Sequence, residues 1–189
     1  SALRSKLQEL IKADNPAGAE ALLNEQGLSL DSDALTELRY RVAWSYYIEN
    51  DDANARRLAA TARVAGGAWA TQSEWVHGLA SWRLGDQREA FASFDKVSRS
   101  ADNDELRSAA LFWSSRAAMA ARQPQQVQPR LQAAARLQET FYGLLASEAL
   151  GMEPVASKTM RYYSTNWKQL GQQENVRTAV ALAAIGKDS

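Results

Sequence analysis

The stretch WVHGLASWRLGDQREAFASF, Trp75–Phe94, contains a short turn between two segments with apolar residues at helical spacing. Two small residues flank the turn glycine Gly85, with Gly78 before it and Ala90 after it, and the larger Phe94 follows. Small side chains let two antiparallel helices approach closely, and a larger one can fill the contact with the next pair of helices. The stretch therefore predicts a helical hairpin.

The same kind of turn recurs along the chain at intervals of 36, 35 and 37 residues, at Asp14-Asn15, Asn50-Asp51, Gly85-Asp86 and Arg122-Gln123. The small or apolar positions around these turns are kept loosely in the other units, as Ala19 and Leu23, as Ala43, Ala55 and Ala59, and as Ser115, Val127 and Leu131. This layout resembles the tetratricopeptide repeat, in which helical hairpins stack in file. It predicts an all-α fold, a right-handed α-superhelix of tetratricopeptide-like hairpins.

We expect one α-superhelical domain over residues 1–189, with repeats at about 2–34, 35–70, 71–102 and 103–138 and further helices within 140–186. The helices are expected at 2–13, 16–24, 33–49, 52–64, 73–84, 87–98, 104–121, 125–138 and 141–150, and with weaker patterns at 164–170 and 174–185. Gly66 and Gly67 are typical of a helix C-terminus, and we expect them to end the fourth helix.

Composition argues against several functional classes. The 22 basic and 22 acidic residues leave no net charge, which gives a nucleic-acid partner little electrostatic support. The absence of cysteine excludes disulfides, zinc–thiolate sites and a cysteine nucleophile. The single histidine, His77, adjoins a predicted helix contact, which favours packing over catalysis or metal binding. We expect no metal and no cofactor. We also expect no membrane span, because the longest apolar stretch, residues 179–185, is far shorter than the roughly 20 residues that cross a bilayer.

Aromatic residues recur on the first helix of successive units, at positions that face the concave side of a tetratricopeptide-like superhelix. The residues that we predict to line a glycan- or peptide-binding groove are Tyr40, Trp44, Tyr47, Trp75, Trp82, Arg83, Phe112 and Arg116. Flat amphipathic rings suit a sugar chain or an extended peptide, and the two arginines would supply directional donors. The alternative is that these rings pack helix pairs against one another or against a neighbouring domain.

Three blocks of the sequence resemble the superhelical domain of soluble lytic murein transglycosylases, in that family's order. In the first block, Trp75–Phe94, the matching residues are Trp75, Gly78, Leu79, Arg83, Leu84, Asp86, Ala90 and Phe94. The second block, RSAALFWSSRA at 107–117, matches in Phe112, Trp113 and Arg116. The third, TFYGLLASEALG at 140–151, matches in Phe141, Tyr142, Gly143 and Ala146.

The resemblance implies a periplasmic enzyme that cleaves peptidoglycan glycan strands without water, and in which a helical arm carries a C-terminal catalytic domain. That domain is marked by Glu-Ser and, farther on, by Gly-Leu-Met-Gln, and neither is present here, since Ser73-Glu74 and Ser147-Glu148 have the reverse order. We therefore expect a non-catalytic arm that guides glycan strands and packs against a catalytic domain in the parent protein. The alternative, which rests on the repeat alone, is a free-standing tetratricopeptide-like adaptor for a protein or peptide.

Overall fold

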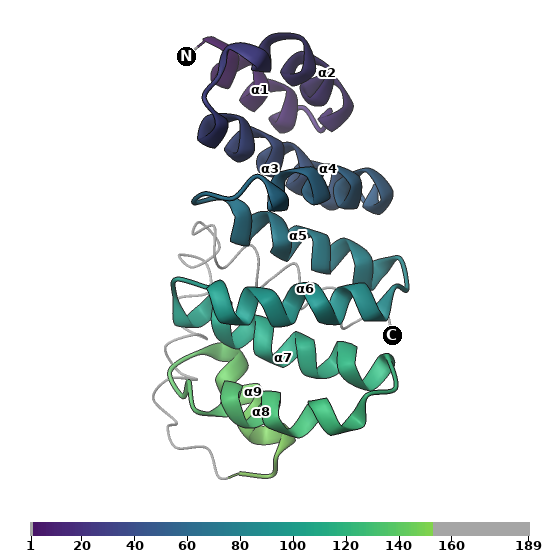
Figure 1. Ribbon diagram of the computed structural model, residues 1–189, viewed down its shortest axis with the longest axis vertical. Helices are drawn as coiled ribbons and strands as arrows, with labels where there is room; N and C mark the ends of the chain where they lie inside the picture. Colours follow the sequence, from purple (N-terminus) through teal and green to yellow (C-terminus); the bar gives the residue numbers. More distant parts are fainter. Residues whose placement is uncertain (1, 153–189) are drawn as a thin grey trace. The chain divides into compact units, whose positions relative to one another are not determined.

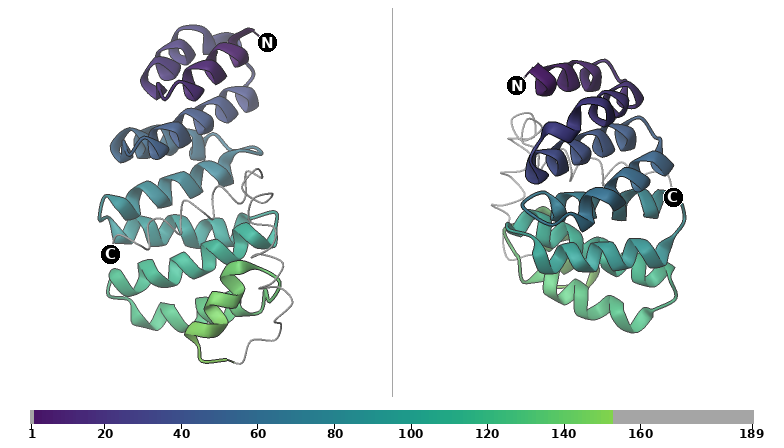
Figure 2. Two further views of the ribbon diagram at one scale, coloured as in Figure 1. Left: turned by 180° about the vertical axis from the view of Figure 1, so that it is seen from behind. Right: turned by 45° about the horizontal axis from the view of Figure 1, so that its top comes forward.

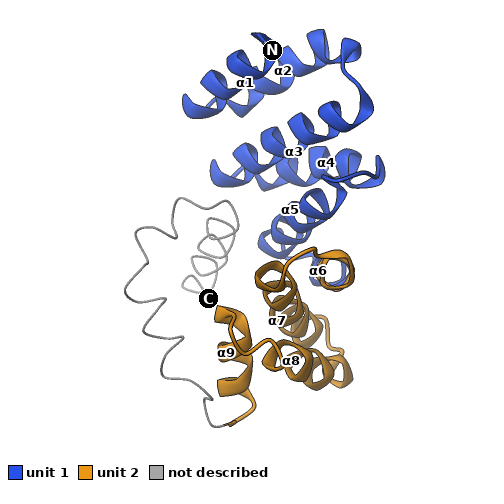
Figure 3. Ribbon diagram, turned by 90° about the vertical axis from the view of Figure 1, so that its left-hand side faces the viewer, with its two compact units in different colours: residues 1–93 blue, residues 94–189 orange. Residues whose placement is uncertain are grey.

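The computed structural model describes residues 2–152, and helices are the only regular secondary structure in this part of the chain, which has no strand (Figure 1). The all-α prediction is confirmed. The helices are α1 (Ala2–Lys12), α2 (Pro16–Gln26), α3 (Ser32–Ile48), α4 (Asp52–Val64), α5 (Ala70–Arg83), α6 (Gln87–Ser100), α7 (Asp104–Ala120), α8 (Val127–Ala135) and α9 (Phe141–Ala149), with 3-10 turns η1 (Gly27–Ser29) and η2 (Pro124–Gln126). The chain forms two compact units, residues 1–93 and 94–189, with the division inside α6 (Figure 3).

The four predicted turns share one backbone conformation. Their first residues are left-handed, with φ of 56° at Asp14, 62° at Asn50, 80° at Gly85 and 60° at Arg122. The amide of each donates to the carbonyl three residues back, at 3.0–3.1 Å, and the next amide donates to the carbonyl five residues back, at 2.8–2.9 Å. This pair of bonds is the Schellman motif, which satisfies carbonyls at a helix end. The predicted positions of the turns are therefore confirmed.

In three of these turns the residue that completes the motif also begins the next helix. The side chains of Asn15, Asp51 and Asp86 accept hydrogen bonds from the amides of Gly18, Asn54 and Glu89 respectively. A side-chain oxygen at this position satisfies an amide that the helix itself leaves unpaired. A single residue thus closes one helix and caps its successor, which keeps the connection as short as possible.

A fifth turn of the same kind follows α9. Gly151 has a φ of 68°, its amide donates to Glu148 at 2.9 Å, and the amide of Met152 donates to Ser147 at 2.9 Å. The helix α9 therefore ends in the same way as α1, α3, α5 and α7. Sequence analysis did not identify this turn as part of the repeat, because Gly151 follows Arg122 by 29 residues rather than by 35 to 37.

Within the first unit each helix packs against its neighbours in sequence, from α1 to α5. In addition, α1 contacts α3, and α3 contacts α5 (Figures 1 and 2). The small residues predicted at the helix contacts are fully buried, including Ala19, Ala43, Ala55 and Ala59, and Gly78 is buried in α5. These contacts are those of successive hairpins.

In the second unit α7, α8 and α9 all contact one another. Ala134 and Ala135 of α8 and Ala146 of α9 form a small core. Four partly buried side chains pack around it, namely Leu111, Phe112, Leu131 and Leu150. The short alanine side chains let α8 and α9 lie close together, and the larger side chains close the rim.

We expected a helix over 125–138, whereas α8 covers Val127–Ala135. The predicted boundaries were therefore wrong at both ends. Pro129 explains the late start: it has no amide to donate, so it is tolerated only in the first turn, where it is the third residue of α8. At the other end the Leu137 carbonyl accepts hydrogen bonds from the amide (3.1 Å) and hydroxyl (2.7 Å) of Thr140, and the chain leaves the helix. The helices expected at 164–170 and 174–185 lie outside the described residues.

Substituting alanine for either of two glycines should lower the free energy of unfolding by different amounts, because the added methyl group would meet different surroundings. At Gly143 a Cβ would lie 2.0 Å from the Leu137 carbonyl oxygen, whereas at Gly85 it would meet nothing within 4 Å but would sit on a left-handed residue. We expect Gly143→Ala to lower the free energy of unfolding by about 3 kcal/mol and Gly85→Ala by about 1 kcal/mol. Urea titrations followed by circular dichroism measure both, and an equal or reversed order would refute the assigned cause.

Candidate functional site

Five of the predicted groove residues are aromatic and lie in the first unit, and they differ in how much of their surface is exposed. Tyr40, Tyr47 and Trp75 are buried, with 5%, 1% and 2% of their surface exposed. Trp44 on α3 and Trp82 on α5 keep an intermediate exposure. Three of the rings therefore belong to the packed interior, and two retain accessible surface.

Tyr40 packs against a tryptophan that sequence analysis did not single out. Its ring stacks on Trp69, with centroids 5.4 Å apart and an interplanar angle of 25°. The Arg41 guanidinium lies 5.5 Å from the Trp69 ring, and its Nε donates to Glu37 at 3.0 Å. Partial burial opposes ionisation of Glu37, but hydrogen bonds and charges from Arg4 and Arg41 prevail and lower its pKa. The sequence analysis used Gly66 and Gly67 only as a helix end, and helical periodicity gave no signal for Trp69, which follows them by two residues.

Arg83, the arginine predicted to serve a ligand, instead connects α5 to the turn between α3 and α4. Its Nε donates to Asp52 at 2.8 Å and its Nη1 to Asn50 at 3.2 Å, while Nη2 donates to Asp52 and to the Tyr47 carbonyl. The guanidinium also lies 3.6 Å from the centre of the Tyr47 ring, on which Trp44 stacks at 5.5 Å. All three nitrogens of Arg83 are thus used within the first unit.

The remaining predicted groove residues, Phe112 and Arg116, lie on α7 in the second unit. Phe112 contacts Tyr142 of α9, with ring centroids 5.3 Å apart, and meets Trp113 edge-on at 6.1 Å. Burial raises the pKa of Tyr142 to about 12, against an opposing hydrogen bond with Trp113. Arg116 is exposed, and its guanidinium lies 5.3 Å from the Trp113 ring. The sequence blocks 107–117 and 140–151 therefore meet in one aromatic contact.

His77 lies in a buried polar network rather than in a purely apolar contact. Its Nδ1 lies 2.9 Å from the Ser93 hydroxyl and 3.2 Å from Arg63 Nη1, which also donates to Glu74 at 2.8 Å. Serine, histidine and glutamate are the residue types of a nucleophilic triad, but here Glu74 pairs with Arg63 instead of orienting the imidazole, and Ser93 is fully buried. The arrangement supports a structural role. Among the described residues no cluster of three or more histidine, aspartate or glutamate side chains could hold a metal ion.

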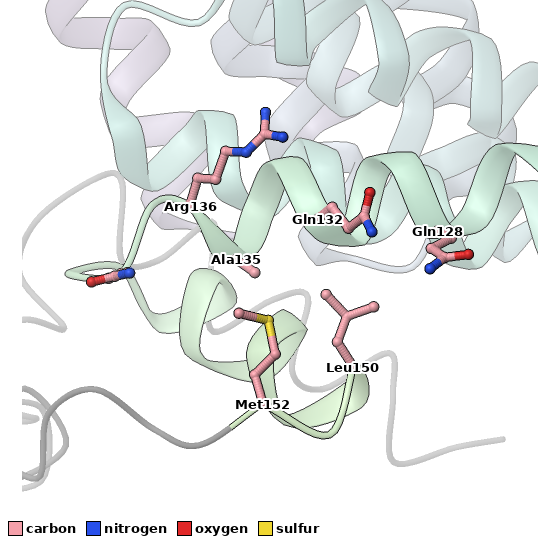
Figure 4. A pocket seen from close by; sticks show the side chains of 7 residues that line it. Gln128, Gln132, Ala135, Arg136, Leu150 and Met152 are labelled. Atoms are coloured by element: carbon pink, nitrogen blue, oxygen red, sulfur yellow. The ribbon is translucent and has the colours of Figure 1, made fainter.

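Two hollows lie elsewhere on the described chain. One, of about 430 Å³, lies between α8 and the end of α9 (Figure 4). It is lined by Gln128, Gln132, Ala135, Arg136, Gln138, Leu150 and Met152. The other, of about 510 Å³, is lined by Leu3, Glu25, Gln26, Leu28, Ser29 and Leu30. Neither hollow includes a predicted groove residue.

Comparisons of the chain with protein-family models, with curated proteins and with solved structures found no match. None of the helices that the structure describes is both long and apolar enough to span a bilayer.

The contacts of Arg83 lead to a stability prediction. We expect Arg83→Met to lower the free energy of unfolding by about 2 kcal/mol, because it leaves Asp52 and the Tyr47 carbonyl without their charged donor. Arg83→Lys should restore only part of the loss, since an ammonium group lacks the planar fork that reaches several acceptors and lies against a ring. Arg88→Met, an exposed arginine on α6, is the matched control and should change stability by less than about 0.5 kcal/mol. Full rescue by lysine in chemical denaturation would show that charge alone matters.

Proposed function

We propose that the chain is the non-catalytic helical arm of a soluble lytic murein transglycosylase, acting in the periplasm on peptidoglycan during cell-wall turnover. The observation that carries the proposal is the contact of Phe112 and Trp113 with Tyr142. These residues belong to two of the three sequence blocks that resemble the family, and they are among the matching residues of those blocks. A common packing core gives a physical reason for the two blocks to occur together.

The proposal includes the right-handed superhelix. Its support is local: five turns share one Schellman geometry, and within the first unit α1, α3 and α5 contact in succession. Hairpins that are closed by the same turn and that stack through their first helices follow one another with a similar rotation at each step, which generates a curved stack.

In this role the arm positions glycan strands for a catalytic domain of the parent protein. Among the predicted groove residues, Trp44 and Trp82 in the first unit and, separately, Arg116 in the second unit keep accessible surface. An indole ring offers an apolar face to the C–H face of a sugar, and a guanidinium donates to hydroxyl or carboxylate oxygens. The chain itself supplies position rather than bond cleavage.

The repeat geometry also supports the second candidate, a free-standing tetratricopeptide-like adaptor that holds a peptide. The parent reading frame separates the two. The arm requires a Glu-Ser block followed by Gly-Leu-Met-Gln within roughly the next couple of hundred residues, the size of one further domain. A stop codon directly after Ser189 would contradict the arm and leave the adaptor.

Binding is tested by titrating the chain with muropeptide oligomers while tryptophan fluorescence is recorded. We expect a saturable change, weakened about tenfold by Trp44→Ala or Trp82→Ala because each removes a stacking face. The Arg88→Met variant should bind like the wild type, and thermal melts confirm that each variant is folded. No response of the folded wild type at millimolar ligand would exclude glycan binding by this chain.

A further inference from the structure

Four polar side chains from three helices meet inside the first unit. Arg63 comes from α4, Glu74 and His77 from α5, and Ser93 from α6. Glu74, His77 and Ser93 are buried, with 2%, 5% and none of their surface exposed. Buried polar groups at a helix junction stabilise it only when each of them has a partner. These four residues form the polar junction.

Arg63 decides the protonation state that this junction accepts. A guanidinium can only donate, so its Nη1, 3.2 Å from His77 Nδ1, requires that nitrogen to be an acceptor without a proton. The Ser93 hydroxyl, 2.9 Å from the same nitrogen, can either donate or accept. Neutral His77 therefore carries its proton on Nε2. A proton added at Nδ1 would remove the acceptor of Arg63 and place two positive charges next to each other.

The charges around the imidazole reinforce this preference. Burial lowers the pKa of His77 to about 4, and the charge of Arg63 adds to the effect. Glu74 acts in the opposite direction but is itself paired with Arg63 at 2.8 Å. Farther away, Arg56 lowers the pKa and Asp86 raises it, and these two residues form an ion pair with each other at 3.1 Å.

We propose that the polar junction is an acid-sensitive lock, which holds α4, α5 and the first half of α6 together at neutral pH and releases them when His77 takes up a proton. The inference is independent of the proposed function, since it rests only on contacts within the first unit. The proton comes from solvent, and no other group of the junction has to change its charge.

The direction in which stability changes with pH follows from the difference between the pKa of His77 in the folded and in the unfolded chain. His77 has a folded pKa of about 4 and a reference pKa of 6.5, so the unfolded chain binds the proton more readily. Stability is therefore complete above pH 6.5 and falls as the pH drops from 6.5 toward 4. The folding equilibrium constant should fall about 20-fold between pH 7 and pH 5, and about 300-fold by the time both states are protonated.

The test uses the full chain, in which His77 is the only histidine. Its Cε1–Hε1 resonance in a heteronuclear NMR titration should not move toward the imidazolium position until the pH is well below 6. Urea unfolding at pH 7 and pH 5 should give the 20-fold loss for wild type, and His77→Gln should lose much less, since glutamine does not titrate. A resonance that titrates near pH 6.5 in the folded chain would overturn the proposal, even if the glutamine variant failed to fold.

Two further measurements separate a lock from general acid unfolding. Arg63→Gln removes the adjacent cation and should raise the pH at which His77 titrates, whereas Arg57→Gln, on the exposed side of the same helix, should leave it unchanged. Hydrogen exchange at pH 5, corrected for intrinsic rates, should increase in peptides from α4 to the first half of α6 before it increases in α7. Uniform exchange along the chain, or an Arg63→Gln variant with unaltered titration, would contradict the lock.

Discussion

The left-handed residue at the end of each leading helix is the constraint on which the rest of the structure depends. Only a residue with positive φ lets two successive amides turn back onto the helix that has just ended. The chain uses Gly85 and Gly151 for this, but also Asp14, Asn50 and Arg122. Asparagine and aspartate tolerate this region better than most residues, whereas Arg122 accepts its cost because the two hydrogen bonds and the hairpin contact outweigh it. Every later contact presupposes this reversal, because it brings the second helix of each hairpin alongside the first.

Successive hairpins are joined by arginines that reach back or forward by about one repeat. In the first unit these pairs are Arg4 with Glu37, Arg57 with Glu20, Arg83 with Asp52 and Arg56 with Asp86. In the second unit Arg130 pairs with Asp95 at 2.8 Å. Their sequence separations run from 30 to 37 residues, close to the spacing of the turns. The more exposed of these pairs each add only about 0–1 kcal/mol, so their main effect is to fix which residues of neighbouring hairpins face each other. Most of the stability comes from the buried apolar side chains.

The sequence contained the periodic part of this structure and little of its side-chain detail. Turn positions and small residues could be predicted because the backbone conformation of a helix end and the close approach of two helices restrict which residues fit. The start of α8 was missed although Pro129 is visible in the sequence, because the apolar pattern was followed across it. The roles of Trp69 and Arg83 could not be predicted in this way. Helical periodicity predicts the face of a helix on which a side chain lies. How deeply that side chain is buried, and what it contacts, depends on residues about 30 positions away, as Arg83 depends on Asp52.

The burial of side chains, which helical periodicity does not predict, decides which residues of the candidate groove remain accessible. Tyr40, Trp44 and Tyr47 follow one another on the same stripe of α3, yet two of them are buried and only Trp44 keeps accessible surface. The accessible ring is connected to the interior, since Trp44 stacks on Tyr47, Tyr47 lies beneath the Arg83 guanidinium, and Arg83 is bonded to Asp52. A ligand placed on Trp44 would therefore act on the same contacts that hold the second and third hairpins together. An indole that is free to move would lose conformational entropy when a ligand bound to it, and the packed rings beneath Trp44 reduce that loss by holding it in place. Packing of the aromatic residues is therefore compatible with binding by the one that keeps accessible surface.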